Sequence, residues 1–201
     1  MNQAYQEDSF AREARRRGYR SRSALKLIEL DDRFGFLQPG ARVLDLGAAP
    51  GGWAQVAAGR VGTQPPARVI AVDIKPIEPI TGVERYTHDV CACDLLVGAE
   101  GQALPSFDVV LSDMAPATSG RGWLDQERSA ALARRALQFA TTHLAPAGWF
   151  VVKIFQGSSE TDFFDEVRPF FARTVRAKPK ASRSQSKEMF IVGKNYQGGA
   201  Y

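Results

Sequence analysis

The chain has 201 residues, of which 44% are hydrophobic, enough to bury the core of a single domain over residues 1–201 without disulfide or metal support. Lys and Arg outnumber Asp and Glu by 26 to 22, which gives a formal net charge of +4 and favours a polyanionic partner. The N-terminus lacks the apolar segment of a signal peptide, and no run approaches the ~20 apolar residues of a membrane span, so we expect a cytoplasmic protein without membrane association.

The first predicted element is a basic helical segment over about residues 9–36. Ser23 is a candidate N-cap, and Pro39-Gly40 ends the helical pattern. The basic residues of this segment, against the single acid Glu13, are Arg12, Arg15, Arg16, Arg17, Arg20, Arg22 and Lys26. A second basic cluster comprises Arg168, Arg173, Arg176, Lys178, Lys180, Arg183 and Lys187. Two such clusters flanking a core favour a nucleic-acid surface over an ordinary solvated helix face, and they predict salt-dependent binding.

Strand and helix signals alternate through the rest of the chain. Strong strand patterns occur at 42–45, 68–73, 107–112 and 149–155, with weaker ones at 85–89, 174–178 and 189–193. Helical patterns occur at 53–59, 126–144 and 160–171, and the second of these ends in a turn predicted at Pro146 and Gly148. Because the strongest strands are continuous apolar runs, they suit a sheet buried on both faces. The pattern predicts a doubly wound α/β fold with seven strands.

The sequence VLDLGAAPGGW over 43–53 is the clearest ligand signal. A buried strand ends at Asp45 and leads into a loop with Gly47, Gly51 and Gly52, where missing side chains let the backbone turn tightly and approach a ligand. The loop lacks the G-x-G-x-x-G spacing of dinucleotide enzymes. It therefore favours an adenosine cofactor without a pyrophosphate.

Acidic residues end the next two strands. Asp73 lies 28 residues after Asp45, where an acid typically grips ribose hydroxyls, and Asp89 could accept a hydrogen bond from an adenine amino group. Taken alone, Asp73 is more simply a turn or capping aspartate. Its distance from the glycine loop favours the ligand role.

Cysteine usage is sparse. Cys91 and Cys93 are too few for a disulfide framework and indicate a reducing compartment. With His88 and Asp89 they match no common zinc spacing, so we predict no metal.

Four further motifs narrow the function. They are SDMAP at 112–116, VVKIFQG at 151–157, YRSRSALKL at 19–27 and SRSQSKEMFIV at 182–192. Together with the glycine loop they resemble the FtsJ-like ribose 2′-O-methyltransferases that modify large-subunit ribosomal RNA, over about residues 10–193. The resemblance implies a Rossmann-like class I fold, S-adenosylmethionine as cofactor, and a uridine in large-subunit ribosomal RNA as substrate. A single basic face indicates a monomer.

The resemblance assigns roles residue by residue. The family's Lys-Asp-Lys-Glu catalytic tetrad falls on Lys26, Asp113, Lys153 and Glu188, with Lys153 deprotonating or orienting the ribose hydroxyl. Its cofactor contacts fall on Gly51, Trp53, Asp73, Asp89 and Asp113, beside Asp45, Gly47 and Gly52 of the glycine loop. The residues predicted to bind RNA are Arg16, Arg17, Arg20, Arg22, Lys178, Lys180 and Arg183.

Two other functions compete with this interpretation. One is a transfer-RNA ribose methyltransferase of the same superfamily, which shares the tetrad, although GGW in place of its typical GSW favours the ribosomal branch. The other is a non-catalytic ribosome-assembly factor that binds RNA, against which the complete tetrad argues. The family also commonly has asparagine at the position of Ala117 and tyrosine at that of Phe190.

Overall fold

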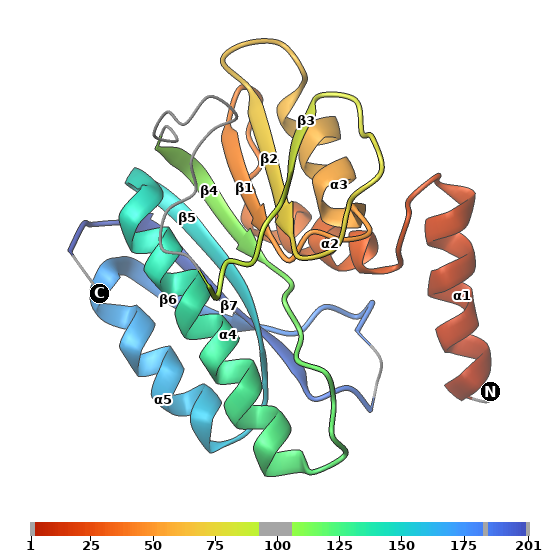
Figure 1. Cartoon of the computed structure of the whole chain (residues 1–201), viewed down its shortest axis with the longest axis vertical. Helices are drawn as coiled ribbons and strands as arrows, with labels where there is room; N and C mark the ends of the chain where they lie inside the picture. The colour runs from red at the N-terminus through yellow and green to blue at the C-terminus, as the bar shows by residue number, and fades with distance from the viewer. Residues whose placement is uncertain (1–2, 93–105, 183–184, 200–201) are drawn as a thin grey trace.

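A seven-stranded sheet forms the centre of the computed structural model, which describes residues 3–92, 106–182 and 185–199 (Figure 1). The strand order is β3-β2-β1-β4-β5-β7-β6. The strands are β1 (Arg42–Leu46), β2 (Arg68–Asp73), β3 (Val83–Thr87), β4 (Phe107–Ser112), β5 (Leu144–Phe155), β6 (Phe171–Ala177) and β7 (Glu188–Tyr196). All pairs are parallel except those of β7, which runs antiparallel to both β5 and β6.

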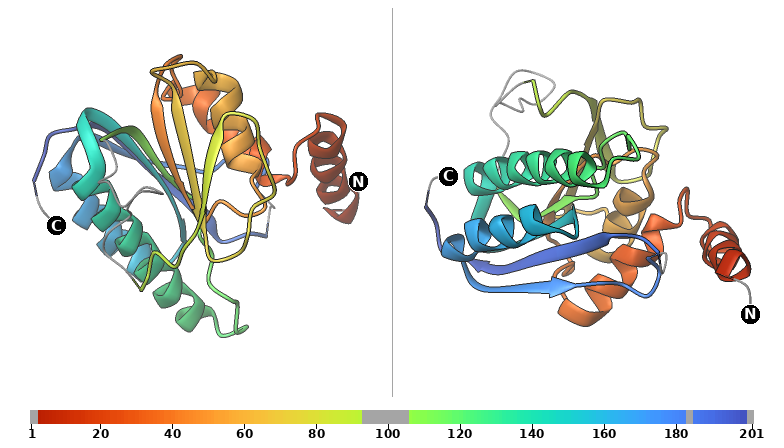
Figure 2. Two further views of the ribbon diagram at one scale, coloured as in Figure 1. Left: turned by 45° about the horizontal axis from the view of Figure 1, so that its top comes forward. Right: turned by 90° about the horizontal axis from the view of Figure 1, so that it is seen from below.

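Helices cover both faces of this sheet (Figures 1 and 2). They are α1 (Gln3–Arg16), α2 (Ser23–Phe34), α3 (Gly52–Val61), α4 (Gly122–His143), α5 (Ser158–Val167) and the short 3-10 helix η1 (Arg168–Phe170). Apolar residues of α2 and α3 share one core with one face of the strands, and those of α4 and α5 share a second core with the other. This arrangement explains why the central strands are apolar throughout. The predicted fold, a mostly parallel seven-stranded sheet with helices on both faces, is confirmed.

The predicted N-terminal helical segment is two helices, not one. The chain breaks after Arg16 at Gly18, whose φ of 76° lies in the left-handed region that glycine adopts without strain. The prediction that Ser23 caps a helix is wrong, because Ser23 is already inside α2 and its hydroxyl lies 2.7 Å from that of Ser21. In Figure 1, α1 stands apart from the other helices.

Strand β5 starts earlier than predicted. The turn expected at Pro146 and Gly148 lies inside the strand, which runs from Leu144 to Phe155. A shift in its register with β4 and a φ of 66° at Ala147 mark a local irregularity. The turn residues therefore distort a strand without ending it. Within the described residues, no helix is long and apolar enough to cross a bilayer.

Candidate active site

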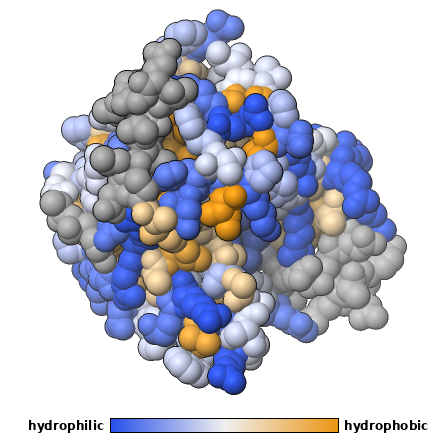
Figure 3. Space-filling model, viewed as in Figure 1, coloured by the Kyte–Doolittle hydropathy of each residue, from blue (hydrophilic) through white to orange (hydrophobic). Residues whose placement is uncertain are grey.

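A cavity of about 470 Å³ opens at the carboxyl ends of the parallel strands. It lies where the strand order reverses between β1 and β4, the usual ligand position in a doubly wound sheet. On the face seen in Figure 3, hydrophobic residues gather near the middle, over these strand ends. The cavity is lined by Gly47, Ala49, Val72, Asp73, Ile74, Lys75, His88, Asp89, Val90, Cys91, Asp113, Met114, Ala115 and Leu132.

The glycine loop brings backbone to this cavity. Gly47 has a φ of 74°, and a Cβ placed there would overlap the Met114 side chain and lie 3.1 Å from its Cα. The amides of Gly47 and Ala48 both donate to the carbonyl of Val72, which fastens the loop to the end of β2. Glycine is therefore required at position 47 for both conformation and space.

Two of the predicted cofactor acids lie on the cavity wall. Asp73 accepts hydrogen bonds from the amides of Ala49, at 2.9 Å, and Lys75, at 2.8 Å. Asp89 accepts one from the amide of Cys91 at 2.8 Å. These turn-capping contacts leave each carboxylate further lone pairs that could accept a hydrogen bond from a bound hydroxyl or amino group.

Four other predicted cofactor residues do not line the cavity. Asp45 is fully buried beneath the glycine loop. Gly51 and Gly52 face inward, where added Cβ atoms would meet Ile80 and the Ser21 side chain, respectively. Trp53 is 2% exposed; its Nε1 donates to the carbonyl of Ser23 at 2.8 Å, and its ring packs 5.7 Å from that of Phe190. The expectation that the Trp53 side chain flanks the cofactor is therefore corrected: it packs in the core behind the loop.

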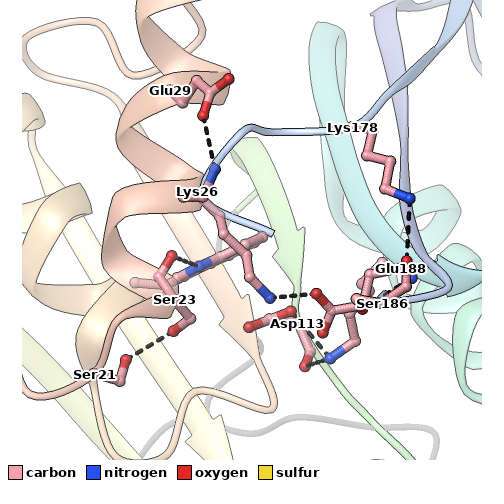
Figure 4. A network of polar contacts seen from close by, with 11 residues as sticks. Ser21, Ser23, Lys26, Glu29, Asp113, Lys178, Ser186 and Glu188 are labelled. Atoms are coloured by element: carbon pink, nitrogen blue, oxygen red, sulfur yellow. Dashed lines mark hydrogen bonds and ion pairs between the residues drawn. The ribbon is translucent and has the colours of Figure 1, made fainter. Parts of the chain in front are cut away.

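The predicted tetrad comes together from four separate parts of the chain, and Figure 4 shows three of its members, Lys26, Asp113 and Glu188. Lys26 of α2 donates a 2.6 Å hydrogen bond to Glu188 at the start of β7. Lys153 of β5 donates to the carbonyl of Asp113 at 2.6 Å. The Asp113 carboxylate lies 3.0 Å from the same ammonium group, paired with it by charge but without hydrogen-bond geometry.

Both ion pairs of the tetrad are largely buried, where water screens the attraction between opposite charges less than at the surface. The side chains of both Lys26 and Lys153 are only 5% exposed. Burial alone would raise the pKa of Glu188, but the charge and hydrogen bond of Lys26 outweigh it, with smaller contributions from Lys153 and Ser186, so that this pKa falls below its ordinary value. Glu188 is therefore held as a carboxylate between the two ammonium groups.

Asp113 belongs to both halves of the site. It follows β4, lines the cavity, and forms the ion pair with Lys153. Within the described part of the chain, its carboxylate Oδ1 is buried without a hydrogen-bond partner. Asp113 therefore contacts both the cavity and the buried Lys153 of the tetrad.

Some residues that line the cavity or position the tetrad have little or no signal in the sequence. Ile74 and Met114 line the cavity, and their positions directly after Asp73 and Asp113 could have indicated them. Leu132, from the middle of α4, has no such signal. Ser186 positions the last strand, because its hydroxyl accepts from the amide of Glu188 at 3.2 Å.

The residues predicted to bind RNA have unequal freedom to do so. Arg16 and Arg17 are exposed but both pair with Glu13, and their hydrogen bonds, that of Arg16 first, lower its pKa to about 2. Lys178 donates to the carbonyl of Ser186 (Figure 4), and Lys180 is exposed. Arg22 is half-buried just before α2. Arg183 and Cys93 lie outside the described residues.

Arg20 has a structural task that sequence reasoning missed. Its guanidinium donates to three backbone carbonyls: Pro50 in the glycine loop, and Glu78 and Pro79 in the connection from β2 to β3. Its donors join these two loops, and its contact with RNA stays a prediction.

The sequence matches the FtsJ-like methyltransferase family over residues 19–196. The chain belongs to this family. It is 43% identical over 194 residues to the ribosomal RNA large subunit methyltransferase E of Wolbachia sp. subsp. Brugia malayi, covering 96% of this chain and 87% of that one. It is 45% identical over 193 residues to the protein of the same name from Acidiphilium cryptum, covering 96% and 84%.

A solved structure supports the same FtsJ-like assignment. It is a protein of Plasmodium falciparum described as a ribosomal RNA methyltransferase, with a TM-score of 0.78 and 27% identity over 90% of this chain and all of that chain. Membership of the FtsJ-like family implies a bound methyl donor. The cavity, with acids on its wall and Asp113 facing the tetrad, fits such a group.

Proposed function

We propose that this protein transfers the methyl group of S-adenosylmethionine to a ribose 2′-hydroxyl, that of a uridine, in large-subunit ribosomal RNA. The observation that carries the proposal is the double position of Asp113, on the wall of the cavity and in the ion pair with Lys153. We further propose that the protein acts as a cytoplasmic monomer.

The cavity suits an adenosine cofactor. Asp73 would hold the ribose hydroxyls, Asp89 the adenine amino group, and the close backbone of Gly47 would face the methionine end near Asp113. When bound, S-adenosylmethionine supplies an electrophilic methyl group on a positively charged sulfur. The protein must add orientation, a proton acceptor and control of charge.

The tetrad would supply these three functions. Lys153 Nζ would orient the ribose hydroxyl as an ammonium group, or accept its proton as the neutral amine, and Asp113 would position Lys153 through the 2.6 Å bond to its carbonyl. Lys26 and Glu188, joined at 2.6 Å, would hold the ribose and balance charge beside Lys153. Because both lysines are almost fully buried, their charges act with little screening.

The substrate class rests on the relatives and on the surface charge. Curated relatives over 40% identical carry the name of a large-subunit ribosomal RNA methyltransferase. The exposed Lys180, and Lys178 beside it, flank the segment that leads to Glu188. Recognition of a 2′-hydroxyl also selects RNA over DNA.

Methyl transfer from radiolabelled S-adenosylmethionine tests the proposal. Large ribosomal subunits, free ribosomal RNA and transfer RNA are supplied as alternative acceptors, and we expect label in the 2′-O-methyl ribose of large-subunit RNA. Label only in transfer RNA would favour the transfer-RNA enzyme. No label on any acceptor, with RNA binding intact, would favour the assembly factor.

Lys153→Ala tests the mechanism in the same assay. We expect its methyl transfer rate to fall about 10²–10⁴-fold, since a positioned proton acceptor contributes about that factor. Calorimetric titration with S-adenosylmethionine should still show binding, because Lys153 does not line the cavity. Arg128→Ala, at an exposed position on α4 outside both basic clusters, is the control. A Lys153→Ala protein that keeps wild-type turnover would contradict the assignment.

A further inference from the structure

A second cleft, of about 300 Å³, lies on the α2 side of the sheet. It shares no residue with the cofactor cavity. It is formed by the last turn of α2 and by neighbouring positions on β5, β6 and β7, and its lining residues are Arg33, Phe34, Trp149, Arg173, Val175, Val192 and Lys194. The right-hand view of Figure 2 shows α2 beside β6 and β7.

Three cations converge on this cleft from three different elements. Arg33 ends α2, Arg173 lies on β6, and Lys194 lies on β7, where it is paired in register with both Arg173 and Trp149. All three are exposed, and among the described residues none of them forms an ion pair with a carboxylate. The cleft therefore has positive charge that the fold does not neutralise.

Aromatic rings form the wall between these cations. The Lys194 ammonium lies 5.0 Å from the centre of the Trp149 ring, and the Arg33 guanidinium lies 4.8 Å from that of Phe34. Trp149 is half-buried and is supported from behind by Phe36, at 6.0 Å between ring centres. Cations beside a supported, partly exposed aromatic ring are the chemistry that binds phosphates and stacked bases of single-stranded nucleic acid.

The cleft is within reach of a strand bound at the tetrad. Trp149 and Lys153 lie four residues apart on the same face of β5, which corresponds to about 13 Å. Arg33 follows Lys26 by seven residues along α2, which corresponds to about 10 Å. Glu29, which lies between Lys26 and Arg33 on α2, accepts a hydrogen bond from the amide of Lys180 at 2.9 Å. The segment with Lys178 and Lys180 therefore lies between the tetrad and the cleft.

We propose that this cleft is a second RNA-binding site, which holds a single-stranded part of the substrate a few nucleotides from the methylated ribose. Arg33, Arg173 and Lys194 bind its phosphates, and the Trp149 ring stacks on one base. The inference rests on the proposed function for its choice of RNA as ligand. It assigns to the cleft the task of holding the strand while the tetrad acts on a neighbouring nucleotide.

Charge reversal tests the site directly. The double variant Arg33→Glu/Lys194→Glu is compared with Arg121→Glu/Arg128→Glu, which makes the same change in charge at exposed positions at the start of α4, on the other face of the sheet. Affinity is measured by fluorescence anisotropy with a single-stranded RNA of about twenty nucleotides. Thermal denaturation checks that both variants are folded.

We expect the cleft variant to raise the dissociation constant for the long RNA at least about tenfold, and to lower the slope of log affinity against log salt by about 1.4, or ~0.7 for each of two phosphate contacts. Trp149→Leu should also weaken binding of the long RNA, and Trp149→Phe should restore most of it.

Two outcomes would overturn the inference: a wild-type protein that does not bind the long RNA, or equal affinities of the cleft and control variants for it. None of these measurements needs methyl transfer. A wild-type protein that binds RNA at the cleft without methylating any acceptor would contradict the proposed function alone.

Discussion

Asp45 is a carboxylate whose charge the fold does not compensate. It is fully buried, and its oxygens have no hydrogen-bond partner in the described part of the chain. Burial is the main cause that raises its pKa well above the ordinary value, and the charges of Asp113 and Asp73 add to the shift. The Ala54 amide opposes it, although it falls short of hydrogen-bond geometry.

Asp45→Asn should therefore flatten the dependence of stability on pH. Between the ordinary pKa of 3.8 and the raised folded value, the folded protein keeps a proton that the unfolded chain has lost, so the free energy of unfolding falls as pH rises. Asparagine cannot ionise, so this loss disappears. Melting temperatures between about pH 4 and pH 9 measure it. Parallel curves for the two proteins would contradict the prediction.

Gly47 is subject to two constraints, a positive φ and a close approach to Met114, and comparison with a second glycine can separate their effects. Gly47→Ala introduces a side chain at a φ of 74° and against the Met114 backbone, whereas Gly18→Ala has a similar φ of 76° with no atom within 4 Å. We expect Gly18→Ala to cost about 1–2 kcal/mol of unfolding free energy, from the positive φ alone.

For Gly47→Ala we expect a larger cost and a loss of cofactor affinity, because the loop must move away from Met114. Denaturant titration and calorimetric titration with S-adenosylmethionine measure the two effects. Equal effects of the two substitutions would show that the close approach at Gly47 is unimportant.

At the residue scale, the sequence placed Gly47, Asp73 and Asp89 at the right edge of the sheet, where they line the cavity; their contact with a cofactor stays a prediction. The position of a residue after a parallel strand determines the edge of the sheet at which it lies. Sequence reasoning did not foresee that the Trp53 side chain packs in the core or that Arg20 binds backbone carbonyls. Sequence spacing does not show into which layer a side chain turns, and a basic residue near a predicted RNA surface has the same signal whether it faces RNA or backbone carbonyls.

Arg20 links the glycine loop to the connection between β2 and β3 through hydrogen bonds. Arg20→Ala removes hydrogen bonds to Pro50, Glu78 and Pro79 at once. We expect it to lower the unfolding free energy by about 1–3 kcal/mol, since bonds from a charged donor are worth more than neutral ones. Hydrogen exchange over residues 74–82 should become faster, and cofactor affinity should fall because the glycine loop loses its anchor.

Arg15→Ala is the matched control, because Arg15 carries the same charge nearby and is exposed on α1. Unchanged exchange over residues 74–82 in Arg20→Ala would show that the three bonds are not needed to hold the loop. A loss of RNA affinity without any change in stability would place Arg20 on the RNA surface.

At the element scale, every predicted strand exists, but some boundaries differ. The start of β5 was missed because Pro146 and Gly148 normally end a strand, whereas pairing with β4 carries this one through an irregular turn. The break between α1 and α2 was missed because Gly18 is a single residue in a charged, helix-favouring segment. Strand pairing in the sheet thus outweighs the turn preference of Pro146 and Gly148, whereas no such pairing opposes the helix break at Gly18.

On the scale of the whole molecule, two cores lie back to back across one sheet. Phe163 of α5 is fully buried in one core, and Trp53 is buried in the other. We propose that the two fold as a single domain. Phe163→Ala should lower the unfolding free energy by about 3–5 kcal/mol, the usual cost of a large cavity.

The single-domain proposal makes a sharper prediction for the same variant. In a Trp123→Phe background, tryptophan fluorescence comes from Trp53 and Trp149 of the first core, and circular dichroism reports on the whole chain. The two unfolding curves should coincide both with Phe163 present and in Phe163→Ala. Separate transitions, with the Trp53 side unaffected by the loss of Phe163, would indicate two independent units.

The position of β7 has a consequence for synthesis. It is the last strand in the chain, yet it lies between β5 and β6, and it carries the Glu188 that pairs with Lys26 from 162 positions earlier. Because a ribosome releases the N-terminal part of a chain first, Lys26 emerges long before its acidic partner Glu188, and β5 emerges before the neighbouring strand β7. We therefore expect a nascent chain to be unable to methylate the ribosome that makes it until nearly all of its residues are outside the exit tunnel.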